Sequence, residues 1–451
     1  MKMTAILLRK TSRNSQRKEA FAKAKATIIN MKTLSYINFA LAAIFVACSF
    51  YQAVFAALRL LGKRRHFQAQ KLCRYAVLIP ARNEQSVIGQ LVDSIRAQEY
   101  PADLVDIYVV ADNCTDSTAQ IAFAHGATVY SRQNQEQVGK GYALQFLLEK
   151  IREEHGGESP YDGYFVFDAD NLLDPRYIAE MNKVFSSGHR VVTGYRNTKN
   201  FDDNWITAGY GTWFLRESEY LNRPRDYLNV GCAVSGTGFL FADSILRQFD
   251  GWNWFLLTED LEFTASMIIE GEKVAYCPDA ILYDEQPRNF KQSIFQRSRW
   301  IKGYFQVLAA HGGDLVHTLA ATGRFACYDM LMITLPATVL TVLSILMNTI
   351  MFFVGMISAR HEMGLFAFSA ISALVNSYGL LFLLGAMPLI TERRRIRCSR
   401  RKRVLYAFTF PIFVFTFGVA LLLAVFGNVG WKPIRHSVAV SIDDLSDGSQ
   451  E

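Results

Sequence analysis

Long apolar stretches on both sides of a polar middle region constrain most strongly what this chain can fold into. The stretches are Thr33–Leu61, Met330–Ile357, Gly364–Ile390 and Leu405–Val429. Each is nearly free of charge and long enough to cross a bilayer as a helix. A chain of 451 residues also has room for one substantial soluble domain between them. The sequence therefore predicts a multi-pass membrane protein.

Basic residues are concentrated beside these stretches. Met1–Lys32 carries nine Lys and Arg against one Glu, and Thr391–Arg403 carries eight against one. Such blocks are typical of cytoplasmic membrane flanks. No basic face studded with aromatic residues indicates nucleic acid, so no nucleic-acid partner is expected. The first apolar run begins only near Thr33 and lasts too long for a cleavable signal peptide, which predicts a retained span in the plasma membrane.

The seven cysteines form no paired spacing, and no C-x-x-C motif or His-rich cluster indicates zinc. An odd number of scattered cysteines is consistent with reduced thiols in a domain that faces the cytosol.

From Tyr75 onward, strand patterns alternate with helix patterns, which is typical of an α/β sheet. Tyr75–Pro80 and Val105–Val110 read as strands, each followed by a polar loop and a helix. Tyr164–Phe167 reads as a buried central strand that ends at Asp168-Ala169-Asp170. Two carboxylates at this spacing can hold a divalent ion and the phosphates it carries; a turn or helix cap is the alternative. Farther on, Ile206–Leu221 predicts an aromatic-rich helix.

Two further motifs follow this D-A-D triplet: T-E-D at Thr258–Asp260 and Q-R-S-R-W at Gln296–Trp300. In this order and membrane context, the chain resembles the family 2 inverting glycosyltransferases. More narrowly, it resembles their membrane-embedded branch, the cellulose, hyaluronan, chitin and poly-N-acetylglucosamine synthases. The resemblance covers about Tyr75 to Val307. It implies a GT-A nucleotide-sugar-binding domain with a central, mostly parallel sheet, flanked by N- and C-terminal transmembrane helices and by interfacial helices.

The expected organisation has six parts. They are a basic tail or interfacial helix (1–32), a transmembrane helix (33–61), a cytosolic GT-A domain (75–290), interfacial helices with the Q-x-x-R-W motif (291–328), transmembrane or re-entrant helices (329–430), and a gating-like motif with a polar tail (431–451). If all three C-terminal segments cross, Trp431–His436 lies on the side opposite the catalytic domain. Two topologies therefore remain open. Either all three segments cross the bilayer, or one of them is re-entrant or interfacial, with a break at Pro336 or Pro411.

The resemblance assigns the donor site. Asp168 contacts the nucleotide, and Asp170 ligates Mg²⁺ or Mn²⁺ through the diphosphate, whose charge a divalent cation can neutralise as it leaves. Glu84, Asp112 and Lys140 match the positions that bind the uracil of a UDP-sugar. For Lys140 the alternative is an ordinary solvated charge.

The resemblance also implies that Asp260 is the general base. A carboxylate that deprotonates the acceptor hydroxyl opposite the leaving group gives direct displacement, and hence inversion. Glu259 belongs to the same motif, and complementing the helix N-terminus is its alternative role. Thr258 is expected to cap that helix.

The acceptor and diphosphate residues come from two motifs. In the relatives, the Q-x-x-R-W helix lies under the active site, so Trp300 is expected to stack on the acceptor sugar and Arg299 to meet the diphosphate, beside Gln296. An interfacial helix anchored by Trp and Arg is the alternative. Ser235, Gly236 and Thr237 resemble the family's small-residue acceptor loop, where close approach of the backbone requires glycine.

A loose C-terminal match remains. Trp431, Arg435 and His436 resemble the motif that closes over the diphosphate in hyaluronan-type synthases. An interfacial anchor is the alternative.

The predicted function is processive polysaccharide synthesis. A sugar from a UDP-sugar, with UDP-glucose favoured, would extend a β-glycan that passes through the bilayer, with export or accessory proteins as further partners. The alternatives are a non-processive enzyme that makes a glycolipid, a poly-N-acetylglucosamine or hyaluronan-like synthase, and a transporter or binding subunit with a decayed transferase domain.

Overall fold

The computed structural model describes residues 36–37, 39–41, 43–44, 46–62, 65, 67–334, 363–430, 436, 438–440 and 442. The chain divides into two units, one of Met1–Phe50 with Leu335–Leu380 and one of Tyr51–Thr334 with Leu381–Glu451. The described residues of the first unit are apolar helix. The second unit contains the sheet and the candidate site.

An eight-stranded sheet forms the centre of this second unit, in the order β3-β2-β1-β4-β7-β6-β8-β5. The strands are β1 (Tyr75–Ala81), β2 (Val105–Asp112), β3 (Thr128–Arg132), β4 (Gly163–Val166), β5 (Leu172–Leu173), β6 (Val191–Thr198), β7 (Phe239–Ala242) and β8 (Val274–Asp284). The four strands from β3 to β4 are parallel, whereas β7 runs antiparallel to both β4 and β6. β8 pairs parallel with β6, and β5 antiparallel with β8. The predicted α/β class with a mostly parallel sheet is confirmed.

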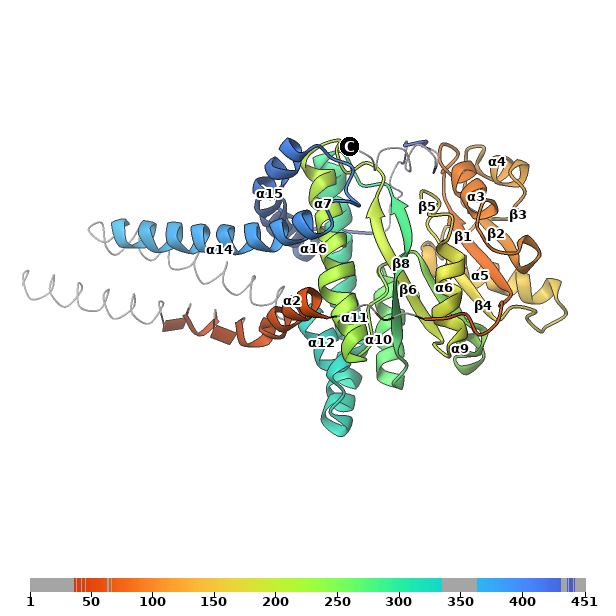
Figure 1. The fold of residues 1–451 in the computed structure, drawn as a ribbon, viewed down its shortest axis with the longest axis horizontal. Coiled ribbons are helices and arrows are strands. Elements are labelled where there is room, and N and C mark those ends of the chain that lie inside the picture. The colour runs from red at the N-terminus through yellow and green to blue at the C-terminus, as the bar shows by residue number, and fades with distance from the viewer. Residues whose placement is uncertain are drawn as a thin grey trace, which may run out of the picture. The chain divides into compact units, whose positions relative to one another are not determined.

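Helices connect and cover the strands (Figure 1). They are α2 (Tyr51–Leu61), α3 (Ile88–Arg96), η1 (Ala102–Leu104), α4 (Thr118–Ala124), α5 (Lys140–Glu154), α6 (Tyr177–Ser186), α7 (Trp205–Arg216), η2 (Glu217–Asn222), α8 (Arg223–Leu228), α9 (Asp243–Gln248), α10 (Glu259–Glu270), α11 (Phe290–Thr322), α12 (Phe325–Thr334), α14 (Met363–Thr391), α15 (Arg400–Phe415) and α16 (Phe417–Phe426). The helix expected at Ile206–Leu221 is thus split, because α7 passes at Glu217 into a stretch of π-helix.

Alternating side chains of the strands build two separate cores. Tyr75, Val77 and Ile79 of β1 face a core shared with α3 and α6. Ala76 and Leu78 face the opposite core, which α5, α7 and α10 complete. Because successive strand residues point to opposite faces, a run of buried apolar residues of this kind requires helices on both faces.

The parallel register brings the polar loops together. β1, β2 and β4 are aligned side by side, with Tyr75 opposite both Val105 and Gly163. The loops that follow these strands therefore leave the sheet at the same edge. The predicted donor-site carboxylates belong to these loops or to the last residue of β2.

Three helices among the described residues are long and apolar enough to cross a membrane: Phe39–Leu61, Leu374–Thr391 and Arg400–Phe426. The predicted span at Met330–Ile357 lies outside the described residues from position 335 onward, as does Pro336. Pro411 lies inside α15, and the turn that separates α15 from α16 is at Thr416. The expectation of a break at Pro411 is therefore wrong.

The C-terminal helices share a core with the sheet domain. Leu389 of α14 and Tyr406 of α15 are buried in the same cluster as the strand residues of β1 and β4. On the other side, α11 packs along α10, α12 and α16. Figure 1 shows α11 running beside α10 and α12 past the end of the sheet. The candidate spans in this unit are thus packed against the soluble domain.

A buried ion network ties α2 to η2 and to the residue that follows α14. The Arg59 guanidinium lies 2.6 Å from a carboxylate oxygen of Glu219 and 2.6 Å from one of Glu392. Arg223 also pairs with Glu219, which is fully buried. Tyr195 of β6 donates a hydrogen bond to Glu392 (3.2 Å). Each buried charge therefore has an opposite charge beside it, which such burial requires.

We predict that Glu219→Gln destabilises the protein by about 3 kcal/mol, because it leaves buried guanidinium groups without a full countercharge. The measurement is the midpoint of denaturant unfolding in detergent. Glu153→Gln is the matched control, since Glu153 forms an exposed pair with Lys150; it should change stability by less than about 0.5 kcal/mol. Equal unfolding midpoints for the two variants would show that the ion network does not contribute to stability as predicted.

Candidate functional site

A cavity of about 300 Å³ opens at the carboxyl edge of the sheet. Most of the predicted site residues line it: Glu84, Asp112, Lys140, Asp168, Asp170, Ser235, Gly236, Glu259, Asp260, Gln296, Arg299, Trp300 and His436. Thr237 lies behind its wall, and Trp431 and Arg435 lie outside the described residues. Segments more than 300 residues apart in the sequence thus meet at one site.

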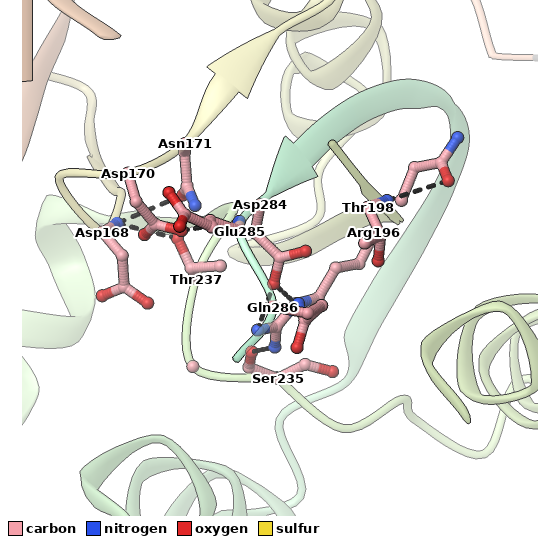
Figure 2. Close-up of polar contacts among 12 residues, drawn as sticks. Asp168, Asp170, Asn171, Arg196, Thr198, Ser235, Thr237, Asp284, Glu285 and Gln286 are labelled. Atoms are coloured by element: carbon pink, nitrogen blue, oxygen red, sulfur yellow. Dashed lines mark hydrogen bonds and ion pairs between the residues drawn. The ribbon is translucent and has the colours of Figure 1, made fainter. Parts of the chain in front are cut away.

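The D-A-D turn is held in place from beneath by Thr237. The Asp168 amide donates to the Thr237 hydroxyl (2.9 Å) and to the Asn171 side-chain oxygen (3.2 Å), and the Thr237 hydroxyl donates to Asn171 as well (Figure 2). Thr237, expected in an acceptor loop, is thus hydrogen-bonded to the D-A-D turn. Its neighbours on the chain, Ser235 and Gly236, do line the cavity.

Asp170 is buried and hydrogen-bonded. One carboxylate oxygen accepts the Glu285 amide (2.7 Å; Figure 2). Burial alone would raise the pKa of Asp170, but the charges of His436 and Lys199 and the Glu285 amide hold it below its usual value. The side chain is thus ionised and able to ligate a cation.

The donor set fits a divalent ion that is completed by substrate. In the described part of the chain, no three His, Cys, Asp or Glu side chains converge as a closed metal site. Mg²⁺ is commonly held by one or two carboxylates together with substrate phosphates. Asp170, with Asp168 nearby, supplies that kind of incomplete site. An ion held there would neutralise negative charge on a diphosphate.

Lys140 lines the cavity and contacts three of its segments. Its ammonium nitrogen is 2.5 Å from Asp168 Oδ1, 2.5 Å from the Gly236 carbonyl oxygen and 3.9 Å from Glu259 Oε1. Burial alone would lower the pKa of Lys140, but Asp168 and Glu259 raise it above its usual value. This lysine therefore links the D-A-D turn to the T-E-D helix as a fixed positive charge, and the alternative of a solvated surface lysine is wrong.

Glu259 and Asp260 begin α10. Burial raises the pKa of Glu259 to about 7, and the neighbouring Asp260 carboxylate adds to the rise. Burial also raises the pKa of Asp260, and the Glu217 carboxylate contributes. A carboxylate with a raised pKa is a stronger base than an exposed one. Thr258 precedes the helix, but its hydroxyl makes no capping hydrogen bond, so the expected cap is absent.

Gly236 gives the backbone access to Asp260. Its φ of +78° lies in the left-handed region, and an added Cβ would lie 3.5 Å from Asp260 Oδ2. Glycine adopts this conformation without strain. The loop can therefore turn its carbonyl toward Lys140 while leaving space before the carboxylate.

Several charged residues that line the cavity were not predicted from the sequence, among them Arg196, Glu217 and Asp284. Arg196 of β6 pairs with Asp284 (2.5 Å) and donates to the Ser235 carbonyl (2.6 Å; Figure 2). Glu217 accepts a hydrogen bond from the Ser235 hydroxyl. None of the three belongs to a short motif. The sequence patterns around Glu217 and Asp284 gave no signal that these side chains face the cavity.

The predicted base-binding residues have partners within the protein. Asp112 pairs with Arg132 (2.7 Å). Both carboxylate oxygens of Glu84 lie near His436 Nδ1, at 2.9 and 3.0 Å. Burial alone would lower the pKa of His436, but Asp170 and Glu84 raise it to about 10. The C-terminal segment thus places a positive charge at the Glu84 end of the cavity.

The Q-x-x-R-W residues lie on α11, facing the cavity. Trp300 packs edge-on against Tyr210 and Phe214. Arg297, the other arginine of the motif, is fully buried and lies 4.4 Å from the Phe413 ring centre, where it attaches α11 to α15. The two arginines therefore have different surroundings, since Arg299 faces the cavity.

Comparison with known proteins gives the family. Residues 73–303 match the model of the family described as glycosyltransferase-like family 2. The chain is 27% identical over 256 residues to a probable glycosyltransferase, YdaM, of Bacillus subtilis (52% of this chain, 56% of the relative). It is 25% identical over 236 residues to a beta-monoglucosyldiacylglycerol synthase of Synechocystis (51% and 47%). It is 24% identical over 254 residues to a poly-beta-1,6-N-acetyl-D-glucosamine synthase of Staphylococcus epidermidis (55% and 58%). The chain thus spans about half the length of the curated relatives it matches.

A solved structure shares the fold. The mannosyltransferase PcManGT of Pyrobaculum calidifontis, solved in complex with GDP-Man and Mn²⁺, superposes with a TM-score of 0.57 at 16% identity. The match covers 86% of this chain and 99% of that one.

We predict that Gly303→Ala lowers kcat/KM about tenfold or more. An added Cβ would lie 2.4 Å from the Thr258 hydroxyl oxygen and 2.5 Å from its methyl carbon. It would therefore push α11 away from the T-E-D segment. A displacement of about 1 Å in groups that position the reactants can lower the rate of the reaction about 10²-fold. Release of nucleotide from the sugar donor is the assay.

Gly313→Ala, on the same helix, is the control for this prediction. No atom lies within 4 Å of its added Cβ, so turnover should stay near wild type, with a gain in helix stability of about 0.5–1 kcal/mol. Near-normal turnover in Gly303→Ala would show that catalysis does not depend on the close approach of α11 to Thr258.

Proposed function

The chain belongs to glycosyltransferase family 2, and from that premise we propose that it transfers a sugar from a nucleotide sugar to a hydroxyl group of a membrane lipid, with inversion. The observation that carries the proposal is one cavity whose lining joins three features: the D-A-D carboxylates, the partly buried Asp260, and the apolar side chains of Trp213, Leu221 and Ile333 together with Arg216, which is hydrogen-bonded to α2. Donor, base and lipid acceptor each have a place in it.

The donor would bind at the carboxyl edge of the sheet. Asp112 and Glu84 lie where a nucleotide base would enter, and Asp168 and Asp170 lie where its diphosphate would sit with a metal ion. Lys140 and Arg299 supply further positive charge to the same cavity. Such charge stabilises the leaving diphosphate as the glycosidic bond breaks. A UDP-sugar remains our expectation for the donor.

The acceptor hydroxyl would be deprotonated by Asp260. A partly buried carboxylate with a raised pKa is a better proton acceptor than an exposed one. The Gly236 turn leaves room before it. Attack on the anomeric carbon from the side opposite the diphosphate inverts its configuration. Glu259, tied to Lys140, would help to keep the base in place.

The lipid acceptor is supported by the far end of the cavity. Trp213, Leu221 and Ile333 line it, and its Arg216 donates a hydrogen bond to Gln52 of α2 (2.7 Å). α2 is the last part of the candidate span Phe39–Leu61. An acceptor in the bilayer would therefore reach the base through this end. Several relatives are named as synthases of monoglucosyldiacylglycerol, a glycolipid.

Processive synthesis of a β-glycan is the second candidate. Other relatives are named as poly-beta-1,6-N-acetyl-D-glucosamine synthases, and Trp300 offers an aromatic face to a sugar chain. The two candidates share donor chemistry and differ in the product.

Product analysis tests the proposal. The purified chain in nanodiscs is given a panel of UDP- and GDP-sugars with Mg²⁺ or Mn²⁺ and a mixture of hydroxylated lipids. We expect one donor to yield a single glycosylated species that partitions into organic solvent. High-molecular-weight material that β-glycosidases digest would overturn the lipid acceptor in favour of polymer synthesis.

Asp260→Asn should lower the rate of sugar transfer at least about 10²-fold, because the amide cannot accept the proton. Binding of the nucleotide sugar should stay within a few-fold, measured by calorimetry. Asp103→Asn, an exposed aspartate on η1, is the matched control. Transfer near the wild-type rate in Asp260→Asn would rule out its role as base.

Asp170→Asn should raise the Mn²⁺ concentration needed for half-maximal activity about tenfold or more, because the amide is a weaker ligand than a carboxylate. Mn²⁺ binding in the presence of nucleotide, followed by electron paramagnetic resonance, gives a readout apart from turnover. Asp250→Asn is the control, since Asp250 is exposed and its positive φ suits Asn. An unchanged metal requirement in Asp170→Asn would contradict its role.

A further inference from the structure

Arg216 has an unusual setting at the apolar end of the cavity. It is the last residue of α7, directly before the π-helical stretch η2. Its guanidinium donates to the neutral side chain of Gln52 (2.7 Å). Among the described residues, no carboxylate lies within ion-pair distance of it.

The neighbouring buried arginines of the cavity differ from it. Arg196 pairs with Asp284 at 2.5 Å, and Arg225 pairs with Asp329 at 2.6 Å. Burial lowers the pKa of Arg216, and although the adjacent Glu217 opposes this effect, the positive charge of Arg225 adds to it. Burying a guanidinium without a paired carboxylate destabilises the folded protein, and a ligand that supplies the negative charge would remove this destabilisation.

The charged groups around Arg216 differ from those around Lys140. The charged or ionisable groups that act on it are Glu217, Arg225 and Tyr51. Those that act on Lys140 are instead the D-A-D and T-E-D carboxylates. Arg216 and Lys140 therefore have different charged neighbours within the same cavity.

The surroundings of Arg216 combine this charge with apolar walls and a membrane helix. Trp213, Leu221 and Ile333 line the same end of the cavity. Gln52 lies nine residues before Leu61, the end of the candidate span, or about 14 Å along a helix. A guanidinium matches the oxygens of a phosphate group, and the walls match acyl or isoprenoid chains.

We propose that Arg216 binds the phosphate group of an anionic lipid acceptor and thereby presents a separate hydroxyl of that lipid to Asp260. This inference rests on the proposed transfer to a lipid and specifies its substrate class. The phosphate is bound and not consumed: the hydroxyl proton moves to Asp260, the new bond forms between the hydroxyl oxygen and the anomeric carbon, and the nucleotide diphosphate leaves.

Paired acceptors test the phosphate site. Full-length protein in phosphatidylcholine nanodiscs is given the sugar donor with either diacylglycerol or phosphatidylglycerol of the same acyl chains. We expect kcat/KM to be about tenfold or more higher for phosphatidylglycerol. Phosphatidic acid added with diacylglycerol controls for surface charge, and soluble glycerol phosphate distinguishes a lipid-borne phosphate from a free one.

Substitutions of Arg216 then assign the preference to this residue. In Arg216→Gln, the ratio of kcat/KM for the two lipids should fall toward one, and Arg216→Lys should retain part of it. Arg176→Gln, at an exposed arginine, should leave the ratio unchanged. Unfolding midpoints and nucleotide binding report whether each variant is folded.

The outcomes separate the two proposals. Polymer without any glycosylated lipid would overturn the proposed function itself. Both lipids used equally, or a preference that survives in folded Arg216→Gln, would leave lipid transfer standing and refute the phosphate site. Glycerol phosphate used as well as its lipid form would refute the lipid part of the inference.

Discussion

The concentration of negative charge at one edge of the sheet is the constraint on which the rest of the site depends. Asp168, Asp170, Glu259 and Asp260 all line one cavity, and like charges at short range in a poorly hydrated site repel strongly. Lys140 offsets this repulsion by contacting two of the segments that carry them. Without a fixed cation at this point, the D-A-D turn and the start of α10 would not remain close together with their carboxylates ionised.

The second requirement is that helices far from the sheet in sequence hold the cavity walls. α11 carries Gln296, Arg299 and Trp300, and it is fixed on its other side by Arg297 in an aromatic cage of α15 and α16. Leu389 and Tyr406 join the core of the sheet domain. The apolar C-terminal helices therefore pack behind the helix that lines the cavity, and they are also candidates for spanning the bilayer.

Local patterns in the sequence were sufficient for three neighbouring strands of the sheet and for most of the predicted residues that line the cavity. β1, β2 and β4 are short apolar runs that end in polar loops, and parallel pairing brings those ends to one edge whatever the details of packing. The patterns did not reveal Arg196, Glu217 or Asp284, because each faces the cavity only through the tertiary arrangement of β6, η2 and β8. The patterns also did not reveal that the Thr237 hydroxyl is hydrogen-bonded to the D-A-D turn. Hydropathy could not decide between Pro411 and Thr416 as the helix boundary, because a proline in a long apolar helix can be accommodated by its neighbours.

The π-helical stretch from Glu217 to Asn222 has a consequence for how this cavity can change. A π turn contains one residue more than an α turn and arises by single-residue insertion into a helix. Here α7, η2 and α8 form one continuous helix. Glu217 and Leu221 of this helix line the cavity, whereas Glu219 and Arg223 belong to the ion network with Arg59. The two sets of side chains are thus offset by a local change of register and not by a change of helix direction. Gain or loss of one residue in this turn would rotate the cavity-lining side chains Glu217 and Leu221 relative to the sheet edge while leaving the strands untouched, so the shape of the cavity could change without a change in the sheet.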